Sequence, residues 1–251
     1  MDSPRKTMIQ VRDLSGGYGD TVILKDISFE VYEGEIFIIL GGSGCGKSTL
    51  LKYMIGLVKP LSGTIRIDGI DVATADEDQY QKALRSFGVM YQNGALFGSM
   101  NLVDNICLVL EEYTDLPREG MEAIAQMRLN QVGLGHAAEK MPSDLSGGMR
   151  KRAAIARAMA LDPKILFLDE PSAGLDPITS AQMDELIIQL SRSLDITFVI
   201  VTHELPSIFT IADRCIILDR NVKTIVATGK PQDLQTHSDN PWVRQFFNRQ
   251  P

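Results

Sequence analysis

A glycine-rich loop between an apolar run and a helical segment constrains this chain more than any other feature. The loop spans residues 41–49 and carries the pattern G-x-x-x-x-G-K-S, after the apolar residues 36–40. Glycines let successive backbone N–H groups turn inward, where the start of a helix adds positive potential. Such a loop predicts a strand–loop–helix cradle for nucleotide phosphates; the alternative is a glycine turn after a buried strand. The residues expected to hold phosphate are Gly41, Gly42, Ser43, Gly44, Cys45, Gly46, Lys47, Ser48 and Thr49.

Two side chains at the end of this loop carry specific chemistry. Lys47 would supply a full positive charge to the β and γ phosphates, and Ser48 a hydroxyl for Mg²⁺. The loop therefore predicts a magnesium–nucleotide site.

Composition restricts the class of protein. The 251 residues are 44% hydrophobic and 23% charged, which is typical of a globular chain with a sizeable core. A net charge of −7 argues against a nucleic-acid partner. No apolar run approaches the roughly 18 residues of a membrane helix, and the first eight residues show no secretory signal. Three scattered cysteines without C-x-x-C spacing fit a reducing cytosol.

Hydrophobic periodicity predicts a β layer near the N-terminus. Residues 7–31 alternate in polarity around a turn-rich break at 15–20, and residues 64–69 read as another strand ending in a turn. These segments flank the phosphate loop, so we expect a small antiparallel sheet attached to the nucleotide core.

The pattern of hydrophobic residues changes in the second half of the chain. Residues 102–159 are mostly helical in pattern and predict a separate helical lobe. The short apolar runs 165–168 and 196–201 are typical of strands buried in a parallel sheet, with an amphipathic helix at 179–193 between them. The expected fold is α/β.

Two acidic residues end the apolar run 165–168. Asp169 is suited to hold Mg²⁺, and Glu170 to polarise a water for in-line attack on the γ phosphate. Acids before Pro171 can also form a solvated turn. Because the carboxyl ends of parallel strands share one sheet edge, the phosphate loop upstream favours the functional interpretation.

A serine–glycine turn gives a second signal. Ser146 can cap the following helix and leave the N–H groups of Gly147 and Gly148 open to an anion, although a merely capped helix is the alternative. Gln92 follows the apolar residues 89–91, and His203 follows the run that ends at Val201. A lone histidine at a strand end is more often structural, but the order of the motifs favours a functional role for His203.

These motifs in this order resemble the nucleotide-binding subunit of ATP-binding cassette (ABC) transporters over nearly the whole chain. The resemblance implies a P-loop NTPase (RecA-like) core with an antiparallel β subdomain and an α-helical subdomain. It also implies a head-to-tail homodimer that sandwiches two ATP molecules with Mg²⁺. The expected division of one domain, 1–251, is core and β subdomain 7–92 and 160–228, helical subdomain 93–159, and tail 229–251.

The resemblance assigns further roles. Tyr18 would stack on adenine, with simple packing on a neighbouring strand as the alternative. Gln92 would join Ser48 and Asp169 around Mg²⁺, and His203 would bind the γ phosphate. The turn formed by Ser146, Gly147 and Gly148 would contact the γ phosphate held by the other subunit, and Asp176 would cross the same interface.

One position departs from the common pattern of the family. Met149 stands where many members have Gln, and we expect hydrolysis to be retained because the serine and glycines make the essential contact. Residues 91–106 and 145–152 are similar to those of Mla/Mce-type phospholipid transport ATPases. That subfamily implies a peripheral position on the cytoplasmic face of the inner membrane. Its partners would be a permease docked near the helical subdomain, a Mce-domain lipid-binding protein and a small cytoplasmic regulator.

Two segments are predicted to contact other parts of the assembly. A groove lined by Leu96, Phe97, Met100 and Leu102 is predicted to receive a short permease helix, unless these residues form the core of the lobe. The aromatic tail around Phe246 and Phe247 is predicted to pack on its own domain or to reach a neighbouring subunit.

Three other functions stay open at this point. The chain could serve an importer of amino acids or other small solutes. A cassette acting on ribosomes or DNA is disfavoured by the acidic charge and by the single cassette without a coiled-coil insertion. A nucleotide sensor without turnover would show no activity in the unmodified protein.

Overall fold

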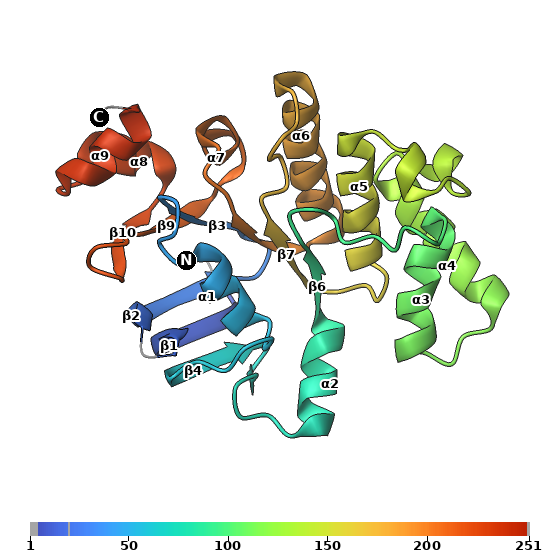
Figure 1. Cartoon of the computed structure of the whole chain (residues 1–251), viewed down its shortest axis with the longest axis horizontal. Coiled ribbons are helices and arrows are strands. Elements are labelled where there is room, and N and C mark those ends of the chain that lie inside the picture. The colour runs from blue at the N-terminus through green and yellow to red at the C-terminus, as the bar shows by residue number, and fades with distance from the viewer. Residues whose placement is uncertain (1–4, 20, 250–251) are drawn as a thin grey trace. The chain divides into compact units, whose positions relative to one another are not determined.

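The computed structural model describes residues 5–19 and 21–249, so four residues of the N-terminal segment, Asp20 and the last two residues of the predicted tail lie outside the described residues. The chain forms two compact units. Unit 1 comprises residues 1–84 and 197–251, and unit 2 comprises residues 85–196. The predicted subdomain borders stay a prediction. Both units are drawn in Figure 1.

Unit 1 contains an antiparallel sheet built from the alternating segments near the N-terminus. Its strands are β1 (Thr7–Tyr18), β2 (Thr21–Tyr32), β4 (Ser62–Ile67) and β5 (Ile70–Asp71), in the order β2-β1-β4-β5. Ile9 pairs with Val31 on one side and with Ile67 on the other, and all three are buried. The predicted antiparallel layer is confirmed.

The turn-rich break expected at residues 15–20 is wrong over residues 15–18. Strand β1 continues to Tyr18, with register shifts around Gly16 and Gly17. A Cβ on Gly17 would lie 1.8 Å from the carbonyl oxygen of Thr21. These glycines therefore allow a tight strand pairing where composition suggested a loop.

Unit 1 also contains the strands that carry the phosphate loop. Strand β3 (Ile36–Gly41) is buried throughout and runs parallel to both β8 (Thr197–Val201) and β9 (Arg214–Leu218), and β9 pairs with β10 (Ile225–Gly229). Continuous apolar sequence in β3 and β8 matches this burial on both faces. Helix α1 (Lys47–Met54) begins directly after the loop. The other helices of this unit are α7 (Leu205–Ile211), α8 (Pro231–His237) and α9 (Pro241–Asn248).

Unit 2 joins a parallel strand pair to a group of helices. Strands β6 (Phe87–Met90) and β7 (Ile165–Asp169) pair in parallel. Helix α5 (Gly147–Ala158) packs on β6 so closely that a Cβ on Gly88 would lie 1.9 Å from the carbonyl oxygen of Ala158. Figure 1 shows α5 together with α3 (Leu102–Tyr113) and α4 (Arg118–Gln131). Unit 2 also contains α6 (Pro177–Leu194) and short turns at Gly135–Ala137 and Pro142–Asp144; α2 (Glu77–Ser86) runs across the border between the units.

The tail packs on its own unit. Val243 and Phe247 of α9 are buried, and the Phe247 ring lies 5.5 Å from that of Phe209, measured between centroids. Trp242 and Phe246 lie 5.8 Å apart and are partly exposed. Of the two predicted roles for the tail, packing on its own domain is confirmed for Phe247.

The predicted docking groove needs a correction. Leu102 begins α3 with its side chain in the core of unit 2, 1% exposed, so it cannot line a surface groove. Its backbone N–H donates to the carbonyl of Lys140, which draws this end of the helix inward. Phe97 is half exposed, and Leu96 and Met100 are partly exposed.

Candidate active site

The phosphate loop has one crowded side and one open side. Gly41 and Gly46 have φ angles of 148° and 105°, and a Cβ on Gly41 would lie 2.4 Å from the carbonyl oxygen of Leu218. A Cβ on Gly42, by contrast, would meet no atom within 4 Å. Glycine is therefore required for packing at Gly41, while the backbone near Gly42 is open to a ligand.

Lys47 and Ser48 stand at the start of α1 as predicted. The Lys47 Nζ donates to the carbonyl oxygens of Gly41 at 2.9 Å and Gly42 at 3.3 Å, so the ammonium lies over its own loop. Ser48 is exposed, and no side chain caps the N-terminus of α1 at Gly46. The uncapped N–H groups at the start of α1, the Lys47 ammonium and the exposed Ser48 form a site suited to a polyphosphate with a hard metal ion.

Cys45 contributes packing to this loop. Its thiol is buried, and burial raises its pKa. A thiol with a raised pKa is a weak nucleophile at neutral pH. The Cys45 side chain therefore contributes packing beneath the loop.

Tyr18 ends β1 with half of its surface exposed, as a stacking platform requires. Sequence reasoning missed a residue that holds this end of β1. Tyr53 of α1 is buried, donates its hydroxyl hydrogen to the Gly17 carbonyl at 3.2 Å, and fills the space beside Gly16. Tyr53 thus ties the end of β1 to the phosphate-loop helix, and the paired glycines before Tyr18 were the available signal.

His203 lies at the same sheet edge as the phosphate loop. Strand β8 ends at Val201, which pairs with Ile39 of β3, and His203 follows two residues later with an exposed side chain. Unit 1 therefore brings together Tyr18, the phosphate loop and His203.

Unit 2 carries the two acids and Gln92 at one edge of its strand pair. Leu168 pairs with Met90, Asp169 ends β7, and Gln92 follows β6 by two residues. Glu170 is 8% exposed and has a φ of 51°. A non-glycine residue in this left-handed region is uncommon and marks a locally constrained backbone.

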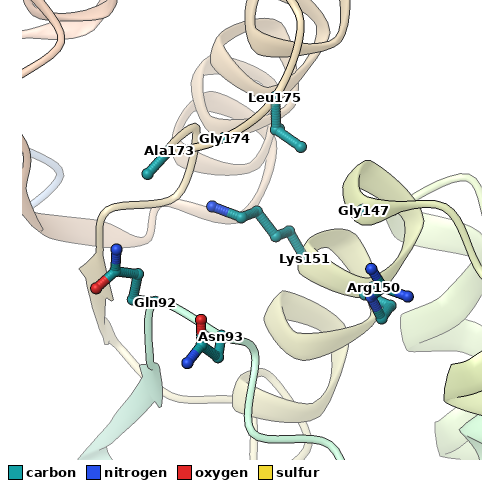
Figure 2. A pocket seen from close by; sticks show the side chains of 8 residues that line it. All are labelled: Gln92, Asn93, Gly147, Arg150, Lys151, Ala173, Gly174 and Leu175. Atoms are coloured by element: carbon teal, nitrogen blue, oxygen red, sulfur yellow. The ribbon is translucent and has the colours of Figure 1, made fainter.

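A cavity of about 470 Å³ in unit 2 adjoins these residues. In Figure 2, Lys151 of α5 extends across it towards the turn at Ala173 and Gly174, with Gln92 and Asn93 on another side. The Lys151 Nζ donates to the Glu170 carbonyl at 2.8 Å. The lining residues are Gln92, Asn93, Gly147, Arg150, Lys151, Ala173, Gly174 and Leu175.

The serine–glycine turn caps α5. The Ser146 Oγ accepts a hydrogen bond from the Met149 N–H at 3.2 Å, which is the predicted cap. A Cβ on Gly148 would lie 2.5 Å from the Thr179 side chain, so the turn packs against α6. Ser146 is exposed and Gly147 partly exposed, which leaves this helix start accessible to an anion.

Asp176 caps α6. Its carboxylate accepts hydrogen bonds from the N–H groups of Ile178 and Thr179 at 3.1 and 3.0 Å and from the Thr179 hydroxyl at 2.6 Å. The bond from the Thr179 hydroxyl is the main reason that the pKa of Asp176 is lowered. Asp176 therefore has a structural role in its own protomer, beside the interface role predicted for it.

Two further residues hold the segment after Gln92, and sequence reasoning missed both. Arg157 of α5 donates to the carbonyls of Gly94 and Ala95 at 3.2 and 2.6 Å. Asn105, 1% exposed, accepts from the Phe97 N–H and donates to the carbonyls of Phe97, Met100 and Asn101 at 2.9–3.1 Å. No local pattern distinguishes these polar residues from ordinary helix-surface ones.

No helix within residues 5–19 and 21–249 is long and apolar enough to cross a membrane. Across those same residues, no cluster of three His, Cys, Asp or Glu side chains could hold a metal ion. The predicted magnesium ligands are instead a hydroxyl, an amide and one carboxylate, a set that fits an ion bound largely through phosphate and water.

Comparison with known proteins decides the family. The sequence model of the ABC transporter family matches residues 24–173. The chain belongs to the ABC transporter family. It is 40% identical over 248 residues to the intermembrane phospholipid transport system ATP-binding protein MlaF of Escherichia coli K12, covering 99% of this chain and 91% of MlaF. It is 41% identical over 245 residues to the probable ribonucleotide transport ATP-binding protein mkl of Mycobacterium leprae, covering 98% of this chain and 70% of that protein.

Solved structures agree. A dimeric post-hydrolysis structure of the ATP-binding cassette MJ0796 with ADP and phosphate has a TM-score of 0.79 and 28% identity, and the match covers 89% of this chain and 98% of that one. The predicted family and P-loop NTPase fold are thereby confirmed. As an ABC cassette the chain is an ATPase that uses ATP and Mg²⁺.

Proposed function

We propose that this chain is the ATPase subunit of a bacterial phospholipid transporter, working as a homodimer beneath a membrane permease. The observation that carries the proposal is the match to MlaF over almost the whole of both chains. A peripheral position on the cytoplasmic face of the inner membrane follows from this assignment. A Mce-domain protein and a small regulator belong to the same proposal.

Within one protomer, each unit supplies part of the chemistry. The phosphate loop and Lys47 bind the β and γ phosphates, and Tyr18 stacks on the adenine. Ser48, Gln92 and Asp169 hold Mg²⁺, which neutralises charge on the phosphates when bound. The exposed hydroxyl of Ser48 and the open side of the loop support this assignment.

Hydrolysis requires a positioned water. Glu170 orients and polarises the attacking water, and His203 donates a hydrogen bond to the γ phosphate. The exposed place of His203 at the sheet edge of the phosphate loop supports its role. The constrained backbone of Glu170 supports a fixed direction for its side chain.

The second copy completes the site. Ser146, Gly147 and Gly148 present the start of α5 to the γ phosphate bound by the partner, and Asp176 crosses the same interface. The accessible position of this helix start supports the proposal, as does the dimeric form of the MJ0796 cassette. One protomer alone would then be unable to hydrolyse ATP.

The permease contact is proposed at the segment after Gln92. Phe97 exposes half of a large apolar side chain there, while Arg157 and Asn105 fix the backbone around it. Because Gln92 begins the same segment, contact at Phe97 would be transmitted to the Mg²⁺ and water shell.

Ribonucleotide transport is a second candidate, because the mycobacterial relative carries that name at a similar identity. The two candidates differ in cargo and share the ATPase. Purification of the native complex separates them.

We expect the purified complex to carry phospholipid, identified by mass spectrometry of its extract, and to hydrolyse ATP. The Glu170→Gln variant should assemble equally well, bind ATP and lose phosphate release by at least about 100-fold, because the water loses its polarising group. Glu185→Gln, a change of the same kind on the outer part of α6, is the matched control and should retain turnover. Ribonucleotide without phospholipid in the extract would refute the lipid assignment, and full turnover by Glu170→Gln would refute the role of Glu170.

A further inference from the structure

A buried lysine in unit 2 has no role in the function described above. Lys151 lies on α5, one turn beyond the serine–glycine turn, and its side chain is 8% exposed. A lysine is rarely buried to this extent, because removing its charge from water costs free energy unless strong partners compensate. Its position therefore requires a structural or functional reason.

Lys151 forms a hydrogen bond with the backbone of Glu170. The Lys151 Nζ donates to the Glu170 carbonyl oxygen at 2.8 Å, and the N–H of Ala173 donates to the same oxygen at 3.3 Å. A hydrogen bond from a charged donor is stronger than one between neutral groups. The bond from the Lys151 ammonium is therefore shorter and stronger than the bond from the Ala173 N–H.

This peptide belongs to the residue with the constrained backbone. Glu170 has a φ of 51°, and among the described non-glycine residues with such a left-handed angle it alone is buried. The direction of the Glu170 side chain depends on that backbone angle. A bond to its carbonyl therefore holds the backbone from which the carboxylate extends.

The same bond connects two segments predicted to face the second copy. From Glu170 the chain turns through Ser172, whose carbonyl accepts from the Leu175 N–H at 3.1 Å, to the α6 cap at Asp176. Figure 2 shows Lys151 reaching from α5 to this turn. Because α5 begins at the serine–glycine turn, Lys151 links that turn to the Glu170 backbone inside one protomer.

We propose that Lys151 is a positioning residue for ATP hydrolysis, which holds the Glu170 backbone in its left-handed conformation and fixes the carboxylate for attack on the γ phosphate. The inference rests on the role proposed for Glu170. It adds a link from the start of α5 to the hydrolytic carboxylate. Movement of α5 when a second copy binds would reach the Glu170 backbone through this bond.

The test compares Lys151→Met, which keeps the length of the side chain without its donor, with Lys151→Arg, which restores a cationic donor. We expect Lys151→Met to lower kcat by about 10- to 100-fold, the effect of a misplaced catalytic group, with KM for ATP changed by less than about threefold. Lys151→Arg should recover part of kcat. Lys164→Met, at the exposed opposite end of β7, is the matched control and should retain both constants.

Fluorescent-ATP binding and thermal melting should stay close to those of the unmodified protein in all three variants. If Lys151→Met does not fold, Lys151→Gln takes its place, since its amide is neutral and ends one bond short of the Nζ position that reaches the Glu170 carbonyl. Unchanged kcat in the Met or Gln variant, loss that lies entirely in KM, or an Arg variant as slow as Met would each overturn the proposal. Turnover by Glu170→Gln, measured in parallel, would instead show that the role of Glu170 is wrong.

Discussion

The two units build their parts of the site by different means. In unit 1 the phosphate loop is made by the backbone: Gly41 and Gly46 supply angles and close approaches that other residues resist, and the Lys47 ammonium rests on carbonyls of its own loop. In unit 2 the corresponding segments are held by distant side chains, with Lys151 on Glu170 and Arg157 on Ala95.

The difference has a physical consequence. A loop whose glycines approach neighbouring backbone closely has no room for a Cβ at those positions, so a methyl group at Gly41 disrupts it. A segment held by a few polar bonds can shift as a unit when a helix moves. Unit 1 is therefore suited to grip nucleotide, and unit 2 to respond to a partner.

The largest expected effect concerns the phosphate loop of unit 1. Gly41→Ala places a methyl group 2.4 Å from a backbone oxygen and should destabilise the fold by about 3 kcal/mol through overpacking and backbone strain. Urea denaturation measures this change. Gly42→Ala, with open space around its Cβ, should unfold at nearly the same urea concentration as the unmodified protein. Equal losses at both positions would break the comparison.

A smaller effect is expected in unit 2, at the segment that follows Gln92. Asn105→Ala removes one accepted hydrogen bond and the two donor hydrogens that three backbone carbonyls share, and should cost about 2 kcal/mol, since several backbone groups lose their partner. Proteolysis near residues 97–101 should become faster, while binding of fluorescent ATP stays unchanged. The exposed Asn221→Ala is the control. Weakened ATP binding without faster proteolysis would contradict the division of roles.

Local sequence signals allowed part of each unit to be predicted. The glycine spacing of the phosphate loop, the apolar runs of β3 and β8, and the cap at Ser146 depend on neighbours in sequence. The cap that Asp176 forms was not predicted, because only an interface role was expected for that residue. Strand β1 was cut short in the prediction because Gly16 and Gly17 are typical of turns, whereas here they allow close pairing.

The rest depends on contacts between distant residues. Arg157 reaches a carbonyl 62 residues away, and Tyr53 one 36 residues away. Lys151 lies in the basic stretch Arg150–Arg152, and such a stretch is typical of a solvated helix face, so its sequence gives no sign of burial. Leu102 was predicted to line a groove, because the sequence alone does not show whether an apolar residue at a helix start is buried or exposed.

The central claim is that each copy lends its serine–glycine turn to ATP held by the phosphate loop of the other. The most direct measurement mixes two inactive variants, Lys47→Ala and Ser146→Arg, and assays phosphate release. A mixed dimer would contain one site with an intact Lys47 from one copy and an intact Ser146 from the other. We predict that the mixture hydrolyses ATP although neither variant does so alone. A mixture that stays inactive, while both variants fold and form mixed dimers, would contradict the account.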